Sequence, residues 1–290
     1  MRRIVRSEAI CLRVRDYHES SKLVTFFTLE SGKVDCLAKG ARRLRSKFGA
    51  ALDLFAKSRI IYYASETRTL LTLSDAELVH SFSGIALQPE RFLAAEQMAE
   101  FALRVIQPHD PSPQLYRLLL NYLSILESCP ASTAPGSPHP APYPALVCSF
   151  LLKAASFLGF RPELRRCLIC RRPIDSQRPA YFEPGRGGVI CPRCAGENPS
   201  GTRLDPAGLD TLAFLLYTPA SEIVQALSPG KGPATGDGRE GRADSGRQNL
   251  QSAICNLQSP LDLVLGFLGH HFDPLVLNSF RWHAGLERNA

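Results

Sequence analysis

Apolar and polar positions alternate in short runs over the first 80 residues, which is the pattern of β-strands. The first run places Ile10, Leu12 and Val14 on an apolar face and Arg13 and Arg15 on a basic one. Four further runs follow, with turn-forming residues between them, at 23–29, 34–38, 52–62 and 69–73. Five short strands in so small a region fit a closed barrel better than a sandwich, which needs about seven strands. We therefore predict a five-stranded OB-fold barrel over residues 1–80.

From about residue 88 the apolar spacing changes to three and four residues, which predicts α-helices. A stripe over 92–106 follows Pro89, and a stripe over 115–126 has the clearest amphipathic spacing in the chain. The segment 146–157 is apolar on nearly every side, so we expect it at the centre of a helical bundle. Further helices are predicted to begin at Asp205-Pro206, Thr218-Pro219 and Ser259-Pro260. The predicted α-helical bundle covers 81–160 and 204–290.

Two segments interrupt this helical pattern. Residues 128–144 contain six prolines and little that could pack, which indicates an extended or flexible loop. Residues 228–259 are first glycine-rich and polar and then repeat the letters NLQS after seven residues. We interpret 228–259 as a disordered insertion and assign it no function.

Four cysteines form the strongest motif in the sequence. Cys167 and Cys170 make one C-x-x-C pair, and Cys191 and Cys194 make a second pair after 20 intervening residues. This is the spacing of a four-cysteine zinc site, in which each pair supplies two thiolates from one tight turn. A disulfide pair is disfavoured in a reducing compartment, and a thioredoxin-like centre is disfavoured because no βαβ pattern surrounds the pairs.

The module around these cysteines, residues 161–203, is short enough that a metal would be needed for it to fold alone. Four thiolates leave no open coordination position for water, so the predicted Zn²⁺, one per chain, is structural and not catalytic. A zinc deaminase is excluded because none of the seven histidines is followed two positions later by glutamate.

A basic segment between two predicted strands is the second candidate site. Its five cations, with no acidic residue among them, are Lys39, Arg42, Arg43, Arg45 and Lys47. A solvated charged loop is the simplest interpretation, but loops of OB-fold barrels also hold single strands by their phosphates. Five phosphate contacts predict a slope of log affinity against log salt of about −3.5 on single strands.

Aromatic residues near this segment have two interpretations. These residues could serve as stacking platforms for bases, but each is more often an ordinary core residue; they are Phe48, Tyr62 and Tyr63.

Charge supports a polyanionic partner. The 290 residues carry 34 Lys and Arg against 27 Asp and Glu, a net charge of +7. Residues 1–80 hold 15 basic and 9 acidic side chains, and 161–203 hold 9 and 4, so the excess lies on the barrel and the cysteine module. The longest apolar run, Val147 to Phe160, is 14 residues and contains Lys153, so it is too short for a membrane span. Charged residues interrupt the apolar positions near the N-terminus, so we expect no signal peptide there. We expect a cytoplasmic protein without a membrane partner.

Other candidate chemistry is weak. His270 and His271 with Asp273 suggest a metal, but a pair at a helix end is more often structural. The P-loop frame is absent around Gly230-Lys231, and no catalytic triad or carboxylate pair stands out. We therefore expect no catalytic residues, no cofactor-binding loop and no enzymatic activity.

Several of these segments together resemble the RecO family of bacterial recombination mediators. The segments that show this resemblance are GARRLRSK from Gly40, FLGFRPELRRCLIC from Phe157 to Cys170, GGVICPRC from Gly187 to Cys194, and Asn278-Ser279-Phe280 near the end of the chain. The resemblance implies an α+β protein, an OB-fold barrel followed by an α-helical bundle with an embedded zinc module. It also implies a DNA repair and recombination mediator that binds single- and double-stranded DNA and anneals complementary strands. With RecR, such a protein assists RecA to load onto DNA coated by single-stranded DNA-binding protein, close to the nucleoid.

We adopt this interpretation as a hypothesis, in which Lys39, Arg42, Arg43, Arg45 and Lys47 hold phosphates without reading sequence. Arginines of the zinc module, from Arg165 to Arg172, would extend the basic surface. The alternative is a zinc-ribbon protein of transcription or translation that binds RNA or polymerase. Annealing of complementary strands without ATP separates the two.

Overall fold

A computed structural model describes residues 3–65, 69–129, 142–175, 177–197, 199–227, 258–272 and 277–280. Most of the predicted proline-rich loop and nearly all of the predicted 228–259 insertion lie outside these residues, as does Asp273. The chain divides into two compact units, Met1–Ser128 with Leu277–Ala290 and Cys129–Val276, called here the first and second units.

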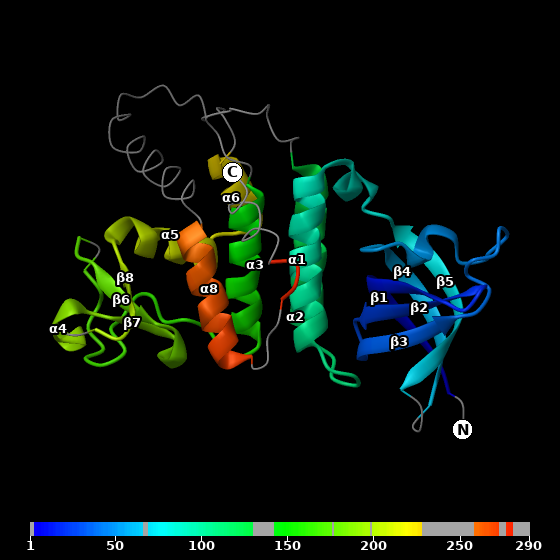
Figure 1. Ribbon diagram of the computed structural model, residues 1–290, viewed down its shortest axis with the longest axis horizontal. Coiled ribbons are helices and arrows are strands. Elements are labelled where there is room, and N and C mark those ends of the chain that lie inside the picture. The colour runs from blue at the N-terminus through cyan, green and yellow to red at the C-terminus, as the bar shows by residue number, and fades with distance from the viewer. Residues whose placement is uncertain are drawn as a thin grey trace. The chain divides into compact units, whose positions relative to one another are not determined.

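The first unit opens with a closed five-stranded barrel, shown in blue to cyan in Figure 1. Its strands run in the spatial order β1-β2-β3-β5-β4, and β1 closes the barrel on β4. β3 and β5 pair in parallel, and the other neighbours are antiparallel. The strands are β1 (Arg3–Tyr17), β2 (Ser21–Thr28), β3 (Gly32–Ala38), β4 (Lys57–Ala64) and β5 (Leu70–His80). This is the OB-fold topology, so the prediction is confirmed.

The fourth strand begins later than the apolar pattern predicts. Leu52 belongs to a short 3-10 helix, η1 (Gly49–Leu52), and not to β4. Ala51 and Leu52 are buried in the barrel core from this helix, together with the preceding Phe48. The apolar positions before β4 therefore pack as a plug of the barrel rather than as strand residues.

The prediction that Ile10, Leu12 and Val14 share one apolar face of β1 is wrong. A β-bulge in this strand exchanges the positions that point into the barrel with those that point out of it. The pairing with β2 shifts register between Cys11 and Arg13. Ala9 and Cys11 therefore point into the barrel core, and after the shift Val14 packs against the same core. Ile10 is buried on the outside, and its cross-strand partner Phe27 packs edge-on against Tyr116 at a ring distance of 5.4 Å.

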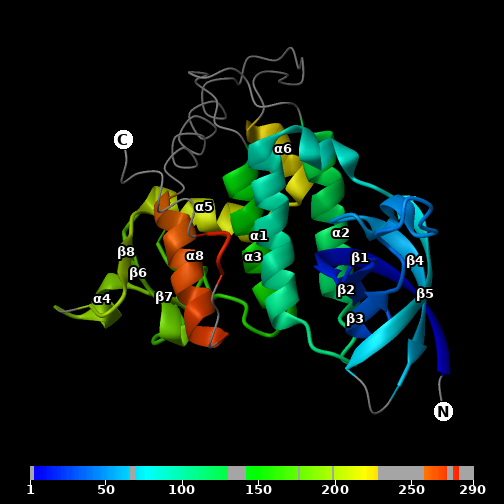
Figure 2. The same cartoon turned by 45° about the vertical axis from the view of Figure 1, so that its right-hand side comes forward.

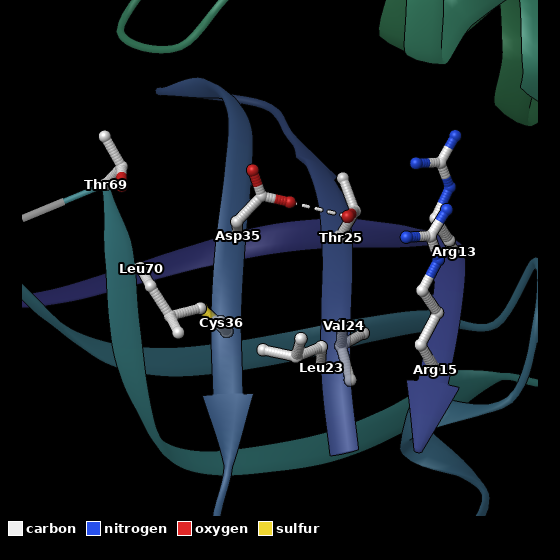
Figure 3. Close-up of a pocket in the computed structure, with 9 residues that line it drawn as sticks. All are labelled: Arg13, Arg15, Leu23, Val24, Thr25, Asp35, Cys36, Thr69 and Leu70. Atoms are coloured by element: carbon white, nitrogen blue, oxygen red, sulfur yellow. Dashed lines mark hydrogen bonds between the residues drawn. The ribbon is translucent and has the colours of Figure 1, made fainter. Parts of the chain in front are cut away.

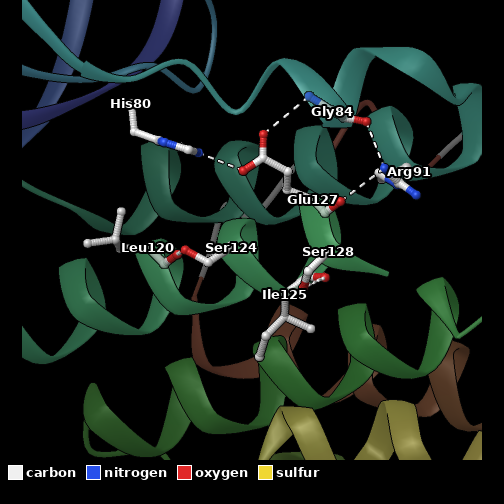
Figure 4. Close-up of polar contacts among 8 residues, drawn as sticks. All are labelled: His80, Gly84, Arg91, Leu120, Ser124, Ile125, Glu127 and Ser128. Carbon is white, nitrogen blue, oxygen red and sulfur yellow. Dashed lines mark hydrogen bonds and ion pairs between the residues drawn. The ribbon is translucent and has the colours of Figure 1, made fainter. Parts of the chain in front are cut away.

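The barrel is followed in the first unit by the 3-10 helix η2 (Ser83–Leu87) and by two described α-helices, α1 (Pro89–Val105) and α2 (Pro113–Ser128). Most of the predicted stripe on α2 is buried, including Leu115, Leu119 and Leu126. Figure 4 shows how the start of this helical part is joined to α2. Glu127 accepts hydrogen bonds from the Gly84 amide at 3.2 Å and contacts the His80 ring at 2.6 Å, and Arg91 donates to the Gly84 carbonyl at 2.8 Å.

Among the described residues of the second unit, four helices pack together beside a small sheet, as Figure 2 shows. They are α3 (Tyr143–Phe157), α5 (Pro206–Tyr217), α6 (Ala220–Leu227) and α8 (Gln258–His271). α3 contacts the other three and is buried on nearly every side, as its apolar sequence predicts. Asp205 caps α5 through a 2.7 Å hydrogen bond from the Gly208 amide.

The cysteine module lies in the second unit and is built on a three-stranded sheet of order β7-β6-β8. Its elements are β6 (Ala180–Glu183), η3 (Pro184–Arg186), β7 (Gly188–Ile190), the one-turn helix α4 (Pro192–Ala195) and β8 (Thr202–Leu204). Among the helices of the described ranges, none has both the length and the apolar content that crossing a membrane requires.

Candidate nucleic-acid interface and metal centre

The fold brings the four predicted cysteine ligands together. The sulfur atoms of Cys167, Cys170, Cys191 and Cys194 all lie within 4.8 Å of one another. The Sγ atoms of Cys170 and Cys191 are 3.9 Å apart. A tetrahedral ion with Zn–S bonds of about 2.3 Å sets its sulfur ligands about 3.8 Å apart, whereas a disulfide requires about 2.05 Å. The cluster therefore has the dimensions of a metal site and not of a disulfide.

Tight backbone turns hold both cysteine pairs. In the first pair, the Arg171 amide donates to the Cys167 carbonyl at 2.9 Å, and Arg171 itself has a left-handed backbone with φ of 59°. In the second pair, the Cys194 amide donates to the Cys191 carbonyl at 3.0 Å at the start of α4. Each turn points both of its thiols toward the same point.

Close packing between the two pairs sets their separation. A Cβ on Gly188 would lie 2.7 Å from the Glu163 carbonyl oxygen, so only glycine allows β7 to approach the segment before Cys167. The Leu168 amide donates to the Val189 carbonyl at 2.9 Å and fixes the same approach.

The electrostatics of the cluster favour a thiolate at Cys167. Burial acts against ionisation there, but hydrogen bonds from the amides of Cys191, Cys170 and Ile169 outweigh it and lower the pKa of Cys167 to about 6. Hydrogen bonding to Cys191 and Cys170 raises the pKa of Cys194 to about 12. Amide donors aimed at sulfur stabilise the negative charge that a cysteine-ligated cation requires. The residues present therefore fit a metal ion with sulfur ligands.

The remaining described cysteines are buried and belong to the packed interior. Burial raises the pKa of both Cys11 and Cys148 to about 12, which keeps these thiols protonated. Cys36 and Cys129 are also buried, and neither is in a disulfide.

The histidine pair has a structural setting in the described residues. The His271 ring contacts the Pro184 carbonyl at 3.1 Å and lies 4.7 Å from the Phe267 ring. His270 approaches Gly185 of η3. α8 thus packs on the turn between β6 and β7 through these rings.

The predicted cationic loop, residues 39–47, lies at the barrel surface with its five cationic side chains exposed. Two of them are engaged by the protein. Arg42 donates to the His18 carbonyl at 2.8 Å and pairs with Asp16 at 3.4 Å, while Lys47 donates to the Ser74 carbonyl. Within the described residues, the side chains of Lys39, Arg43 and Arg45 have no such partner.

Two of the three aromatic candidates are core residues. Phe48 is 3% exposed and Tyr62 is 2% exposed, and the Tyr62 hydroxyl contacts Ser31 Oγ at 3.1 Å. Only the partly exposed Tyr63 retains a ring surface that solvent reaches.

The structure reveals a surface hollow on the outer face of β1, β2 and β3 that the sequence prediction missed. We call it the barrel hollow; it has a volume of about 270 Å³ and is shown in Figure 3. The β1–β2, β2–β3 and β3–β5 pairings set Arg13, Thr25, Asp35 and Leu70 in one cross-strand row. The side chains of Arg13 and Arg15 extend in the same direction along one edge. Its principal lining residues are Arg13, Arg15, Leu23, Thr25, Asp35 and Leu70.

Two arginines side by side give this hollow a positive edge. Burial, with a further contribution from the charge of Arg15, lowers the pKa of Arg13 from its ordinary value. The alternation of Arg13 and Arg15 was visible in the sequence as a basic face. Their neighbours across the sheet were not, because strand order cannot be deduced from spacing.

Comparisons with known proteins agree with this architecture. The family profile described as Recombination protein O N terminal matches residues 1–82, and the profile described as Recombination protein O C terminal matches residues 86–229. The DNA repair protein RecO of Anaeromyxobacter dehalogenans (strain 2CP-C) is 33% identical over 237 residues, which cover 81% of this chain and 87% of that protein. The RecO of Symbiobacterium thermophilum is 34% identical over 210 residues, covering 72% and 78%. The chain therefore belongs to the RecO family of DNA repair proteins.

Proposed function

We propose that this protein is a DNA repair and recombination mediator that binds single- and double-stranded DNA and anneals complementary strands without enzymatic turnover. The observation that carries the proposal is the exposed cationic loop on a closed OB-fold barrel in a chain of this family. Such barrels bind oligonucleotides on their strand face and loops.

Three cations of the loop are free to contact phosphates, and two more lie on the adjacent barrel face. Lys39, Arg43 and Arg45 provide the first group, and Arg13 and Arg15 the second. Arg42 and Lys47 serve mainly to hold the loop. Five contacts again give a slope of log affinity against log salt of about −3.5 on single strands, now from a partly different set of residues.

Annealing follows from how these cations act. Bound to the phosphate backbone, they lower the repulsion between two strands and leave base edges free for pairing. Base pairing then supplies the free energy, so no nucleotide hydrolysis is required.

Our proposal includes RecR as the partner with which the protein assists RecA to displace single-stranded DNA-binding protein.

We propose that Cys167, Cys170, Cys191 and Cys194 hold one structural Zn²⁺. When bound, the ion would cross-link the two cysteine turns of a module whose own hydrophobic core is small. We propose that the chain has three domains: a barrel over 1–80, a helical bundle over 81–160 and 204–290, and the zinc module over 161–203. Elemental analysis that found well under one zinc per purified chain would refute the zinc proposal.

Paired substitutions test the DNA-binding surface. The variant Arg43→Ala with Arg45→Ala should bind single-stranded DNA at least tenfold more weakly at moderate salt, and its salt slope should fall by about 1.4. The matched control removes two ion-paired arginines of the cysteine module, Arg178 and Arg186. This control has the same net charge and should retain most of the wild-type affinity and slope.

Equal losses in the two variants would show that net charge, and not the loop, determines binding. Annealing of complementary oligonucleotides without ATP, followed by fluorescence transfer between strands, tests the activity itself. Failure of the wild-type protein to accelerate annealing would overturn the functional proposal.

A further inference from the structure

The barrel hollow contains a carboxylate in the middle of a surface that otherwise suits phosphates. Asp35 is exposed at its centre, next in the cross-strand row to Thr25 and one strand further from Arg13. A phosphate laid over Asp35 would bring two negative charges together at short range. The backbone of a bound strand is therefore excluded from this point, although the flanking arginines attract it.

The same point has the chemistry that an unstacked base needs. Leu23 and Leu70 provide apolar surface, and Leu70 is 37% exposed although it is a large apolar residue. Arg13 and Arg15 present guanidinium groups along one edge, and a guanidinium plane stacks on bases as well as pairing with phosphates. The volume of about 270 Å³ lies below the range of roughly 300–1,000 Å³ for drug-sized ligands, as expected for a single base.

Asp35 is held in one orientation. The Thr25 hydroxyl donates to Asp35 Oδ1 at 2.6 Å, and Thr25 itself is 9% exposed, so its position is fixed by the sheet. The second carboxylate oxygen is left to accept a hydrogen bond from a ligand. A carboxylate accepts from the exocyclic amino groups of cytosine and adenine, whereas thymine presents a carbonyl oxygen at the corresponding position.

We propose that the barrel hollow is a nucleobase subsite in which Asp35 selects bases that carry an exocyclic amino group over thymine. This inference rests on the proposed DNA binding and adds a base preference to it. Arg13 and Arg15 would hold the adjoining phosphates and stack on the base, while Thr25 positions the carboxylate. The expected preference for oligo(dC) over oligo(dT) of equal length is about tenfold, at the lower end for a direct base contact.

The test measures binding of the full-length protein to oligo(dC) and oligo(dT) by fluorescence anisotropy at one salt concentration. In the wild type, oligo(dC) should bind about tenfold more tightly. Asp35→Asn should bring the ratio close to one, because an amide both donates and accepts. The control Glu77→Gln removes the same charge from the barrel, at a residue paired with Arg59 on the β4–β5 side, and should keep the wild-type ratio.

Thr25→Val provides a second variant of nearly the same shape that leaves the carboxylate in place but removes its hydrogen-bond donor. Its ratio should fall between those of the wild type and Asp35→Asn. Equal affinities of the wild type for the two oligonucleotides, or a preference that survives in Asp35→Asn, would overturn the base subsite while leaving DNA binding intact. Absence of measurable binding to both oligonucleotides would instead overturn the proposed function and this inference with it.

Discussion

Gly32 is the position at which a single added methyl group should destabilise the first unit most clearly. It begins β3 with a φ of +65°, a left-handed backbone that costs an alanine about 1 kcal/mol or more. A Cβ there would also meet two backbone carbonyl oxygens of the α1–α2 connection, those of Asp110 and of Gln107, the latter at 2.5 Å. Backbone atoms cannot rotate away as a flexible side chain can.

The collision has a further cost because hydrogen bonds join the same two segments. The Lys33 amide donates to the Gln107 carbonyl at 3.1 Å, and the His109 amide donates to the Ser31 carbonyl at 3.1 Å. Moving the barrel turn away from the α1–α2 connection would stretch both bonds, each worth about 1 kcal/mol net. Adding the cost of the left-handed backbone to the loss of these hydrogen bonds, we expect Gly32→Ala to destabilise this unit by about 3–4 kcal/mol.

Gly49 offers the matched control, because it has a φ of +47° but no atom of the described residues lies within 4 Å of an added Cβ. Gly49→Ala should therefore cost only the backbone term of about 1 kcal/mol. Hydrogen exchange measured by mass spectrometry on peptides from β2 and β3 reports the local free energy of opening for each variant. If Gly32→Ala were no more destabilising than Gly49→Ala, the close approach to the α1–α2 connection would not contribute, and the reasoning would fail.

Three further outcomes are expected. Burial lowers the pKa of Lys153 from 10.5 to about 8, so the unfolded chain binds more protons between those values and stability rises with pH across that window. In Lys153→Met this rise in the free energy of unfolding should be smaller by roughly 1–2 kcal/mol, a value lowered for solvent screening because Lys153 is partly exposed. Urea titrations at several pH values measure the change. Removing metal with a strong chelator should speed hydrogen exchange in β6 and β7 but not in β2 and β3, and unchanged exchange in β6 would argue against a metal-dependent module. Glu100 accepts from the amides of Asn278 and Ser279, each at 2.8 Å, so Glu100→Gln should loosen 277–280 by about 1–2 kcal/mol and speed proteolysis there, whereas unaltered cleavage would contradict this anchoring.

Features that depend on local spacing could be predicted from the sequence. The two C-x-x-C pairs form a cluster because each pair needs only one tight turn, and the long apolar stretch within α3 (Tyr143–Phe157) is buried because every side of it is apolar. The helix start at Asp205 follows from its own side chain, which caps the next turn.

Features that depend on pairing could not be predicted in this way. The bulge after Cys11 arises from the register between β1 and β2, and alternation within one strand contains no information about its partner. Leu52 continues the apolar pattern of a strand but belongs to η1. It is buried because this 3-10 helix packs into the barrel core, which the pattern alone does not distinguish from burial in a strand. The barrel hollow needs Arg13, Thr25 and Asp35 side by side, and the order of the strands decides this.

The cationic loop shows why a count of charges in a sequence is larger than the number of cations available to a ligand, because two of its five cations are bonded within the protein. Arg42 is bonded to the β1–β2 turn through His18 and Asp16, and its own amide donates to the Ser20 carbonyl at 3.0 Å, so it holds the loop in place. Lys47 does the same at the other end through Ser74. A loop fixed at both ends loses less conformational entropy when its remaining cations bind phosphate, which strengthens each contact that is made. In the proposed mode of binding, Arg42 and Lys47 would thus increase the affinity of Lys39, Arg43 and Arg45 for phosphate without contacting it themselves.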